Sequence, residues 1–97
     1  MPDIAFHTDA AEEMRAAAAS YEARERGLGE RFLDEVEEGL QRIQQFPQLW
    51  PSYEGVYRRY LLKRFPYCLV YRTDPEQIFI IAVAHLHRGP GCWRNRA

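Results

Sequence analysis

The sequence predicts an α+β domain, in which a pair of helices packs against a small group of strands. Residues 8–46 carry apolar side chains at helical spacing, whereas residues 56–83 carry short strand-like runs divided by turn residues. The helical stretch is interrupted at Gly27 and Gly29, and so short a connection makes the two helices an antiparallel hairpin. The apolar stripe of this hairpin must be buried. The strands are the only candidates, because a chain of 97 residues has room for one small domain.

The N-terminal part predicts a brief strand followed by the first helix. Residues Asp3 to His7 alternate between apolar and polar side chains, which is typical of a strand. Thr8 or Asp9 is expected to cap this helix, because Asp9 and Glu12 have the spacing of a capping box. Small side chains at residues 16–19 let a neighbouring element approach this helix closely.

The second helix is predicted from Glu30 to Phe46. Its apolar stripe consists of Phe32, Val36, Leu40 and Ile43. Pro47 and Pro51 end it and open a loop. Within this loop, Trp50 and Tyr53 are expected to cover an edge of the core.

Three further strands are predicted in the second half of the chain. Residues Val56 to Phe65 carry several basic side chains, which indicates a strand at the edge of a sheet. Residues Cys68 to Tyr71 form the next strand, and the turn at residues 73–76 joins it as a hairpin to the last strand. That last strand, Ile78 to Val83, is apolar without alternation, as expected of a central strand that is covered on both faces or lies at a crowded position.

The charges are divided unevenly along the chain. Residues 1–55 carry five basic and twelve acidic side chains, a net charge of −7, and residues 56–97 carry eight basic and two acidic ones, a net charge of +6. The basic groups cluster near strand ends, which favours a phosphate-bearing or acidic partner. The alternative, that exposed charges only complement one another across the domain, stays open.

Composition and termini give expectations about the compartment. The chain has no run of about 18 apolar residues, so no transmembrane helix is expected. The N-terminal residues MPDIAFHTD lack a basic start followed by an apolar block, so no secretory signal is predicted. Without export, Cys68 and Cys92 are expected to stay reduced, and a cytoplasmic location is expected.

The order of elements and several phrases resemble the RelE/ParE superfamily of toxins from bacterial type II toxin–antitoxin systems, over essentially residues 1–97 as a single domain. The motifs that carry the resemblance are Phe65-Pro66-Tyr67, Val70-Tyr71, Ala82-Val83-Ala84-His85, Arg88 and Trp93-Arg94. The resemblance implies a β-α-α-β-β-β fold with a small antiparallel sheet packed on a helical hairpin. It also implies that the last strand lies inside the sheet, beside the first.

The resemblance implies growth inhibition and plasmid stabilisation by one of two mechanisms. RelE-like members cut messenger RNA in the ribosomal A site without a metal, and ParE-like members poison DNA gyrase. Both are neutralised by a cognate antitoxin, so the expected partners are an antitoxin and either gyrase or the ribosome with its message. No cofactor, metal or membrane is expected.

Metal-independent RNA cleavage needs a base, cations for the phosphorane and an acid for the leaving oxygen. The sequence departs from the RelE-like pattern, because Cys68 stands where the family has an arginine. The family's aromatic acid falls at Cys92 or, with a shift of one residue, at Trp93. His85 and His87 are candidates to replace the missing acid and base, and Arg88 stands where an active-site arginine is expected. Imidazole titrates near neutral pH, and the two histidines share a face if strand geometry continues beyond Val83.

Further basic and aromatic residues are candidate contacts to the target or to an anion. They are Arg59, Lys63, Arg64, Trp93 and Arg94. Purely structural interpretations are the alternative. His85 would then only form hydrogen bonds within the fold, Trp93 would pack over the helical hairpin, and Arg94 and Arg96 would belong to a solvated tail. The spacing of His85, His87 and Cys92 lacks a fourth ligand, so no zinc site is predicted.

The incomplete nuclease set favours a toxin that binds DNA gyrase and is not an enzyme. The alternative is a ribosome-dependent endoribonuclease that uses His85, His87 and Arg88. A degraded toxin with neither activity also remains open. Under either active mechanism, the substitution Arg88→Ala is expected to relieve toxicity.

Overall fold

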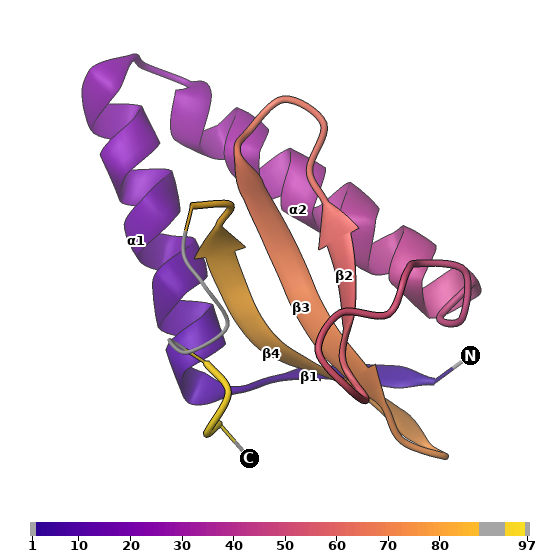
Figure 1. The fold of residues 1–97 in the computed structure, drawn as a ribbon. Coiled ribbons are helices and arrows are strands. Elements are labelled where there is room, and N and C mark those ends of the chain that lie inside the picture. Colours follow the sequence, from indigo (N-terminus) through magenta and orange to yellow (C-terminus); the bar gives the residue numbers. More distant parts are fainter. Residues whose placement is uncertain (1, 88–92, 97) are drawn as a thin grey trace.

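The chain folds into two layers, a helical hairpin and a four-stranded sheet, in a computed structural model that describes residues 2–87 and 93–96 (Figure 1). The predicted α+β class and the order β-α-α-β-β-β are confirmed. The elements are β1 (Asp3–Phe6), α1 (Thr8–Arg24), α2 (Leu28–Gln45), β2 (Arg58–Leu61), β3 (Tyr67–Thr73) and β4 (Gln77–His85). Within this described part of the chain, neither helix is long and apolar enough to cross a membrane.

The sheet has the strand order β1-β4-β3-β2. The last strand therefore lies beside the first, as the family resemblance implied. Strands β2, β3 and β4 are antiparallel neighbours, whereas β1 pairs with β4 in parallel, from Asp3 opposite Gln77 to Phe6 opposite Ile80. The sheet is thus antiparallel over three strands and mixed as a whole.

Helix α1 begins through a histidine rather than through the predicted capping box. His7 is the N-cap residue, and its Nδ1 atom accepts a hydrogen bond from the backbone N–H of Asp9 at 3.0 Å. The predicted cap at Thr8 or Asp9 is therefore wrong. An imidazole nitrogen supplies the acceptor that a serine or aspartate side chain usually provides.

The turn between α1 and α2 depends on Glu22. Gly27 has a φ of 87°, a conformation that favours glycine. The carboxylate of Glu22 accepts hydrogen bonds from the N–H of Gly27 at 2.9 Å and of Gly29 at 3.0 Å, and so α2 begins at Leu28, before the predicted Glu30. A Cβ atom on Gly29 would lie 2.5 Å from the carbonyl oxygen of Ala18, which confirms the predicted close approach of the two helices.

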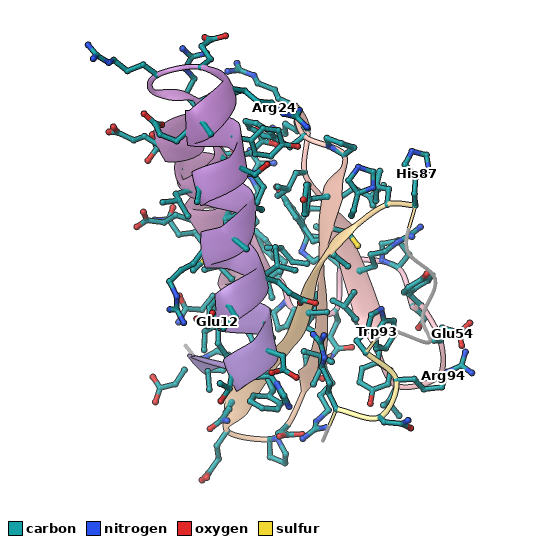
Figure 2. All side chains as sticks on the ribbon, turned by 90° about the vertical axis from the view of Figure 1, so that its left-hand side faces the viewer. Glu12, Arg24, Glu54, His87, Trp93 and Arg94 are labelled. Atoms are coloured by element: carbon teal, nitrogen blue, oxygen red, sulfur yellow. The ribbon has the colours of Figure 1, made fainter. Side chains whose placement is uncertain are left out.

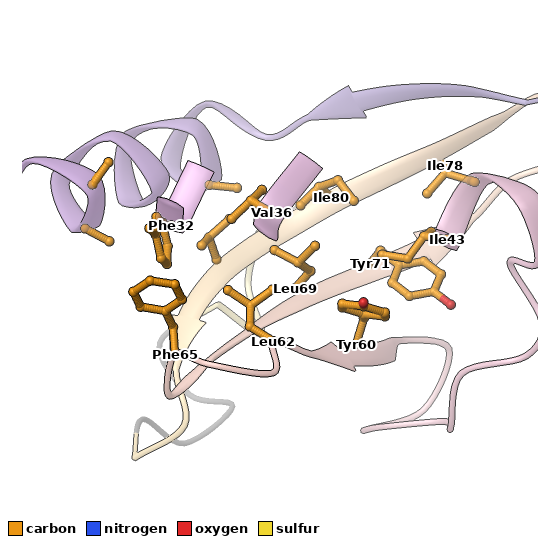
Figure 3. Packing of buried hydrophobic residues seen from close by; sticks show 14 residues of the cluster. Phe32, Val36, Ile43, Tyr60, Leu62, Phe65, Leu69, Tyr71, Ile78 and Ile80 are labelled. Carbon is orange, nitrogen blue, oxygen red and sulfur yellow. The ribbon is translucent and has the colours of Figure 1, made fainter. Parts of the chain in front are cut away.

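The face of the sheet toward the helices carries the larger core, called here the inner cluster (Figure 3). Its members are Ala10, Ala17, Ala18, Phe32, Val36, Ile43, Tyr60, Leu62, Phe65, Leu69, Tyr71, Ile78, Ile80 and Val83. The predicted stripe of α2 lies in it, with Leu40 partly buried beside it. Gly39 lets α2 approach the sheet, because a Cβ atom there would lie 2.8 Å from Cε1 of Tyr60.

The opposite face of the sheet carries a second, smaller core, called here the outer cluster. It consists of Cys68, Val70, Ile81, Ala82, Ala84 and Trp93. Tyr53, Tyr57 and Phe79 pack against it. Strand β4 thus contributes to both cores, which confirms the prediction of a central strand covered on both faces.

Strand β2 lies at the edge of the sheet, as its basic side chains predicted, but it is shorter than the predicted Val56 to Phe65. Residues 62–66 form a turn instead, in which the carboxylate of Glu35 accepts hydrogen bonds from the N–H groups of Lys63 and Arg64. Trp50 and Tyr53 cover the core as predicted. Trp50 packs against the inner cluster, with its ring centroid 4.8 Å from that of Tyr60. Tyr53 packs against the outer cluster.

Candidate functional site

The sequence-predicted site residues that the structure describes lie in three places: the end of β4, the turn between β2 and β3, and the outer face of the sheet. Figure 2 shows His87 apart from Trp93 and Arg94, with all three on the side of the sheet away from α1. Arg88 lies outside the described residues. The described candidates therefore do not form one cluster.

His85 and His87 stack on each other at the end of β4. Their ring centroids are 4.9 Å apart, and Nδ1 of His85 accepts a hydrogen bond from the backbone N–H of His87 at 3.1 Å. Strand β4 ends at His85, so a turn, and not a shared strand face, brings the two rings together. Tyr67 meets His85 edge-on at 5.2 Å. With Nδ1 as the acceptor, the neutral ring of His85 carries its proton on Nε2.

A cavity of about 190 Å³ lies beside His85, between α1 and β4. Small α1 side chains at Ala16, Ala17 and Ser20 make the space. The carboxylate of Glu13 also lines it, but this group already accepts hydrogen bonds from Val83 and Arg96. The cavity therefore offers a ring and a hydroxyl to a ligand more readily than a carboxylate base.

Lys63 and Arg64 lie on the turn between β2 and β3, beside α2. The Nζ atom of Lys63 is 3.7 Å from a carboxylate oxygen of Glu38. The exposed guanidinium of Arg64 has no carboxylate partner among residues 2–87 and 93–96. Both line a cavity of about 270 Å³ that also receives Glu35 and Arg31, so this surface carries both signs of charge.

Arg59, Trp93 and Arg94 come together on the outer face. The guanidinium of Arg59 lies over the ring of Tyr53, 4.2 Å from its centroid. Arg94 donates to Glu54 at 2.6 Å, and Figure 2 shows this pair beside Trp93.

Trp93 is 2% exposed and packs within the chain. Its ring lies 5.0 Å from that of Tyr57 and 5.9 Å from that of Tyr53. The interpretation of Trp93 as packing over the helical hairpin is wrong, because the ring lies on the opposite face of the sheet, where small side chains of β3 and β4 leave room for it.

Ion pairs connect the acidic and basic halves of the sequence. They are Lys63 with Glu38, Arg94 with Glu54, and Arg96 with Glu13 and Asp9. The segregation of charge along the chain is therefore partly neutralised in the folded protein. Among the described residues predicted as target contacts, Arg64 is the exposed basic side chain that forms no ion pair.

Sequence reasoning missed the roles of Glu13 and Arg96. Arg96, interpreted as part of a solvated tail, donates to both carboxylate oxygens of Glu13, at 2.9 and 2.8 Å, and both side chains are 15% exposed. The two residues are 83 positions apart in the chain, and no local pattern marks such a pair.

Tyr71 is buried and donates a hydrogen bond, whereas Tyr21 is partly buried and packs against the inner cluster. Burial raises the pKa of Tyr71 to about 12, and its hydroxyl donates to the carbonyl oxygen of Pro47 at 2.7 Å. Burial, with a smaller effect of neighbouring Tyr67, also raises the pKa of Tyr21. A phenol with a raised pKa holds its proton at neutral pH, so neither residue supplies a base.

Comparisons with known proteins agree with this fold. The family model described as the ParE toxin of the type II toxin–antitoxin system, parDE, matches residues 4–89. A solved structure described as the chromosomal ParDE TA system from P. aeruginosa is similar, with a TM-score of 0.63 and 20% identity over 88% of this chain and 96% of that chain. No curated protein matches. The chain belongs to the ParE toxin family of type II toxin–antitoxin systems.

Proposed function

We propose that this protein inhibits growth by binding DNA gyrase, and that a cognate antitoxin neutralises it. Membership of the ParE toxin family supports the gyrase target, since ParE-like toxins are the gyrase poisons of the superfamily. The similar solved structure from P. aeruginosa is that of a ParDE TA system, which supports a protein partner of the same kind here.

The observation that carries the proposal is the burial of Cys68 and Trp93. Cys68 stands where an RNA-cleaving relative has an arginine. The aromatic acid of such a relative falls at Cys92 or, with a shift of one residue, at Trp93. Here Cys68 and Trp93 are 4% and 2% exposed and belong to the outer cluster. Both side chains thus contribute to packing. RNA cleavage would need exposed reactive groups at these two positions, whereas binding to gyrase would not, and this difference favours the binding mechanism.

The proposed contact surface is centred on the turn between β2 and β3. Arg64 is its central residue, because its side chain is exposed and forms no ion pair among the described residues. Lys63 lies beside it with a loose partner at 3.7 Å. Arg59 and Arg94 extend the basic surface on the outer face, and Arg88 stays a proposed contact from the sequence.

One observation favours a second candidate function, a ribosome-dependent endoribonuclease. The stacked rings of His85 and His87 lie at the end of β4, and His85 lines the cavity beside α1. An imidazole pair in such a place supplies an acid and a base for RNA cleavage. In this alternative, Arg88 would stabilise the charged phosphorane.

Expression of the chain in growing bacteria separates the two mechanisms. We expect growth arrest with induction of the SOS response and intact messages, relieved by a target mutation in gyrase. Primer extension that finds cuts within translated codons, without an SOS response, would establish the nuclease instead.

Charge reversal tests the proposed surface in the same cells. The substitution Arg64→Glu is expected to weaken toxicity at equal expression, because it opposes the contact of an exposed cation with the target. Arg26→Glu is the matched control, since Arg26 is also exposed but lies on the turn between the helices. Equal toxicity of the two variants would move the contact away from Arg64.

A further inference from the structure

Strand β4 extends beyond its parallel neighbour. The pairing with β1 ends at Phe6 opposite Ile80, where the N–H of His7 donates to the carbonyl oxygen of Ile80 at 2.8 Å. On the other side, β3 pairs with β4 as far as His85. From Ile81 to His85, no strand in the described part of the chain pairs with the β1 side of β4.

Two side chains occupy this edge in place of a strand. The carboxylate of Glu13 accepts a hydrogen bond from the N–H of Val83 at 3.1 Å. The guanidinium of Arg96 donates to the carbonyl oxygen of Ile81 at 3.1 Å. The Glu13 carboxylate and the Arg96 guanidinium thus hydrogen-bond to backbone groups of β4 that are two residues apart, as the backbone of a neighbouring strand would.

The same two side chains join the two layers of the protein. Glu13 belongs to α1, on the inner side of the sheet, whereas Arg96 follows Trp93, which packs on the outer side. The backbone N–H of Arg96 donates to the carbonyl oxygen of Trp93 at 2.9 Å. This turn fixes the position of Arg96 relative to Trp93. Arg96 therefore reaches around the edge of β4 to Glu13.

We infer that Glu13 and Arg96 form a latch that couples the edge of β4 to the outer face of the sheet. In the closed state, the edge is capped and Trp93 lies in the outer cluster. In the open state, Glu13 leaves Val83, Arg96 separates from Glu13, and Trp93 leaves the apolar surface that it covers. Because one carboxylate serves both Val83 and Arg96, any group that takes Val83 from Glu13 weakens the hold on Trp93, and the reverse holds equally.

The partial burial of the pair makes this coupling strong. Both side chains are 15% exposed, so the loss of one charge leaves the other largely buried and less well compensated. Arg96 keeps its ion pair with Asp9 at 3.8 Å. The Arg94–Glu54 pair lies in the same segment, but its side chains are 59% and 41% exposed, where water screens the charges. Residues 93–96 thus take part in a largely buried ion pair, Arg96–Glu13, and in an exposed ion pair, Arg94–Glu54. The exposed pair serves as the control for the buried one.

Hydrogen exchange of the Trp93 indole N–H, followed by NMR in the full chain, tests the latch. The variants are Glu13→Gln and Arg96→Gln, with Arg96→Lys as a milder change that keeps the charge and loses the forked contact. Each glutamine variant is expected to raise the exchange rate of the Trp93 indole and of the Val83 amide about fivefold or more. Arg94→Gln is expected to leave both rates close to those of the unmodified protein.

The backbone amide of Leu69, in the centre of the sheet, separates opening of the latch from general destabilisation. The inference requires that Leu69 exchange changes much less than Trp93 exchange. It is overturned if all three rates rise together, or if neither Arg96 variant changes Trp93. The double variant Glu13→Gln with Arg96→Gln should raise the Trp93 rate no further than the larger single effect, and a multiplicative rise would show two independent ties.

Discussion

The two faces of the sheet are covered in different ways. The inner face is closed by two helices whose apolar side chains interlock with the sheet, and the glycines at positions 29 and 39 allow the backbones to approach. The outer face is closed by a loop and by the C-terminal segment, through Tyr53, Tyr57 and Trp93. Ion pairs and a cation–π contact tie this outer cover in place.

The inner face therefore contributes mainly to the stability of the fold, whereas the proposed contacts with the target lie on the outer cover and the turn at residues 62–66. Burial of apolar area is the main stabilising contribution, and most of it lies on the inner face. The basic candidate residues gather around the outer cover and the turn at residues 62–66, where side chains are exposed or held by single polar contacts. Substitutions on the inner face should therefore act on folding, and those on the outer cover should act on local opening and on the target.

The largest effect is expected from Phe32→Ala. Phe32 is fully buried and packs edge-on against Phe65 and Tyr67, at 5.2 and 5.3 Å. Its removal leaves a cavity and should lower the free energy of unfolding by about 3–5 kcal/mol, measured by urea denaturation. The neighbouring Leu33 is 40% exposed, so Leu33→Ala is the control. A loss for Leu33→Ala as large as that for Phe32→Ala would contradict the division between the faces.

An alkaline loss of stability is expected from Tyr71, which lies in the inner cluster. Burial raises its pKa from 10.0 to about 12, so the folded state keeps the proton after the unfolded state has lost it. The stabilisation is complete below pH 10 and disappears as the pH rises toward 12, a loss of roughly 2–3 kcal/mol.

The variant Tyr71→Phe isolates this contribution. Near neutral pH it should lose about 1 kcal/mol, because the hydrogen bond to Pro47 is removed. Between pH 10 and 12 its unfolding free energy should fall less steeply than that of the unmodified protein. Parallel curves for the two proteins in urea denaturation would mean that Tyr71 ionises normally.

The smallest effect is expected from Glu54→Gln. The Glu54–Arg94 pair is short, at 2.6 Å, but both side chains are exposed, so its removal should cost less than about 1 kcal/mol. The loss should shrink further in high salt. A larger loss that persists in salt would place this pair in the structural core of the outer cover.

The parts of the fold that follow from local patterns were predictable. The stripe through Phe32, Val36 and Ile43 repeats at helical spacing and lies in the inner cluster, and the apolar run of β4 is central. The β1–β4 pairing came from the family resemblance, because no local pattern specifies parallel neighbours.

The tertiary contacts of the site were not predictable. The side of the sheet on which Trp93 packs depends on how the chain returns after β4. The Glu13–Arg96 pair joins the two ends of the chain, and its geometry exists only in the folded state. His7 caps α1 because β1 ends directly before it, which composition does not reveal.

The most direct test of the proposed function is a supercoiling assay with purified DNA gyrase and the full chain. The account predicts inhibition of supercoiling that depends on the concentration of the chain and weakens with Arg64→Glu but not with Arg26→Glu. Unimpaired gyrase at every concentration, together with cleavage of messenger RNA on translating ribosomes by the same preparation, would contradict it.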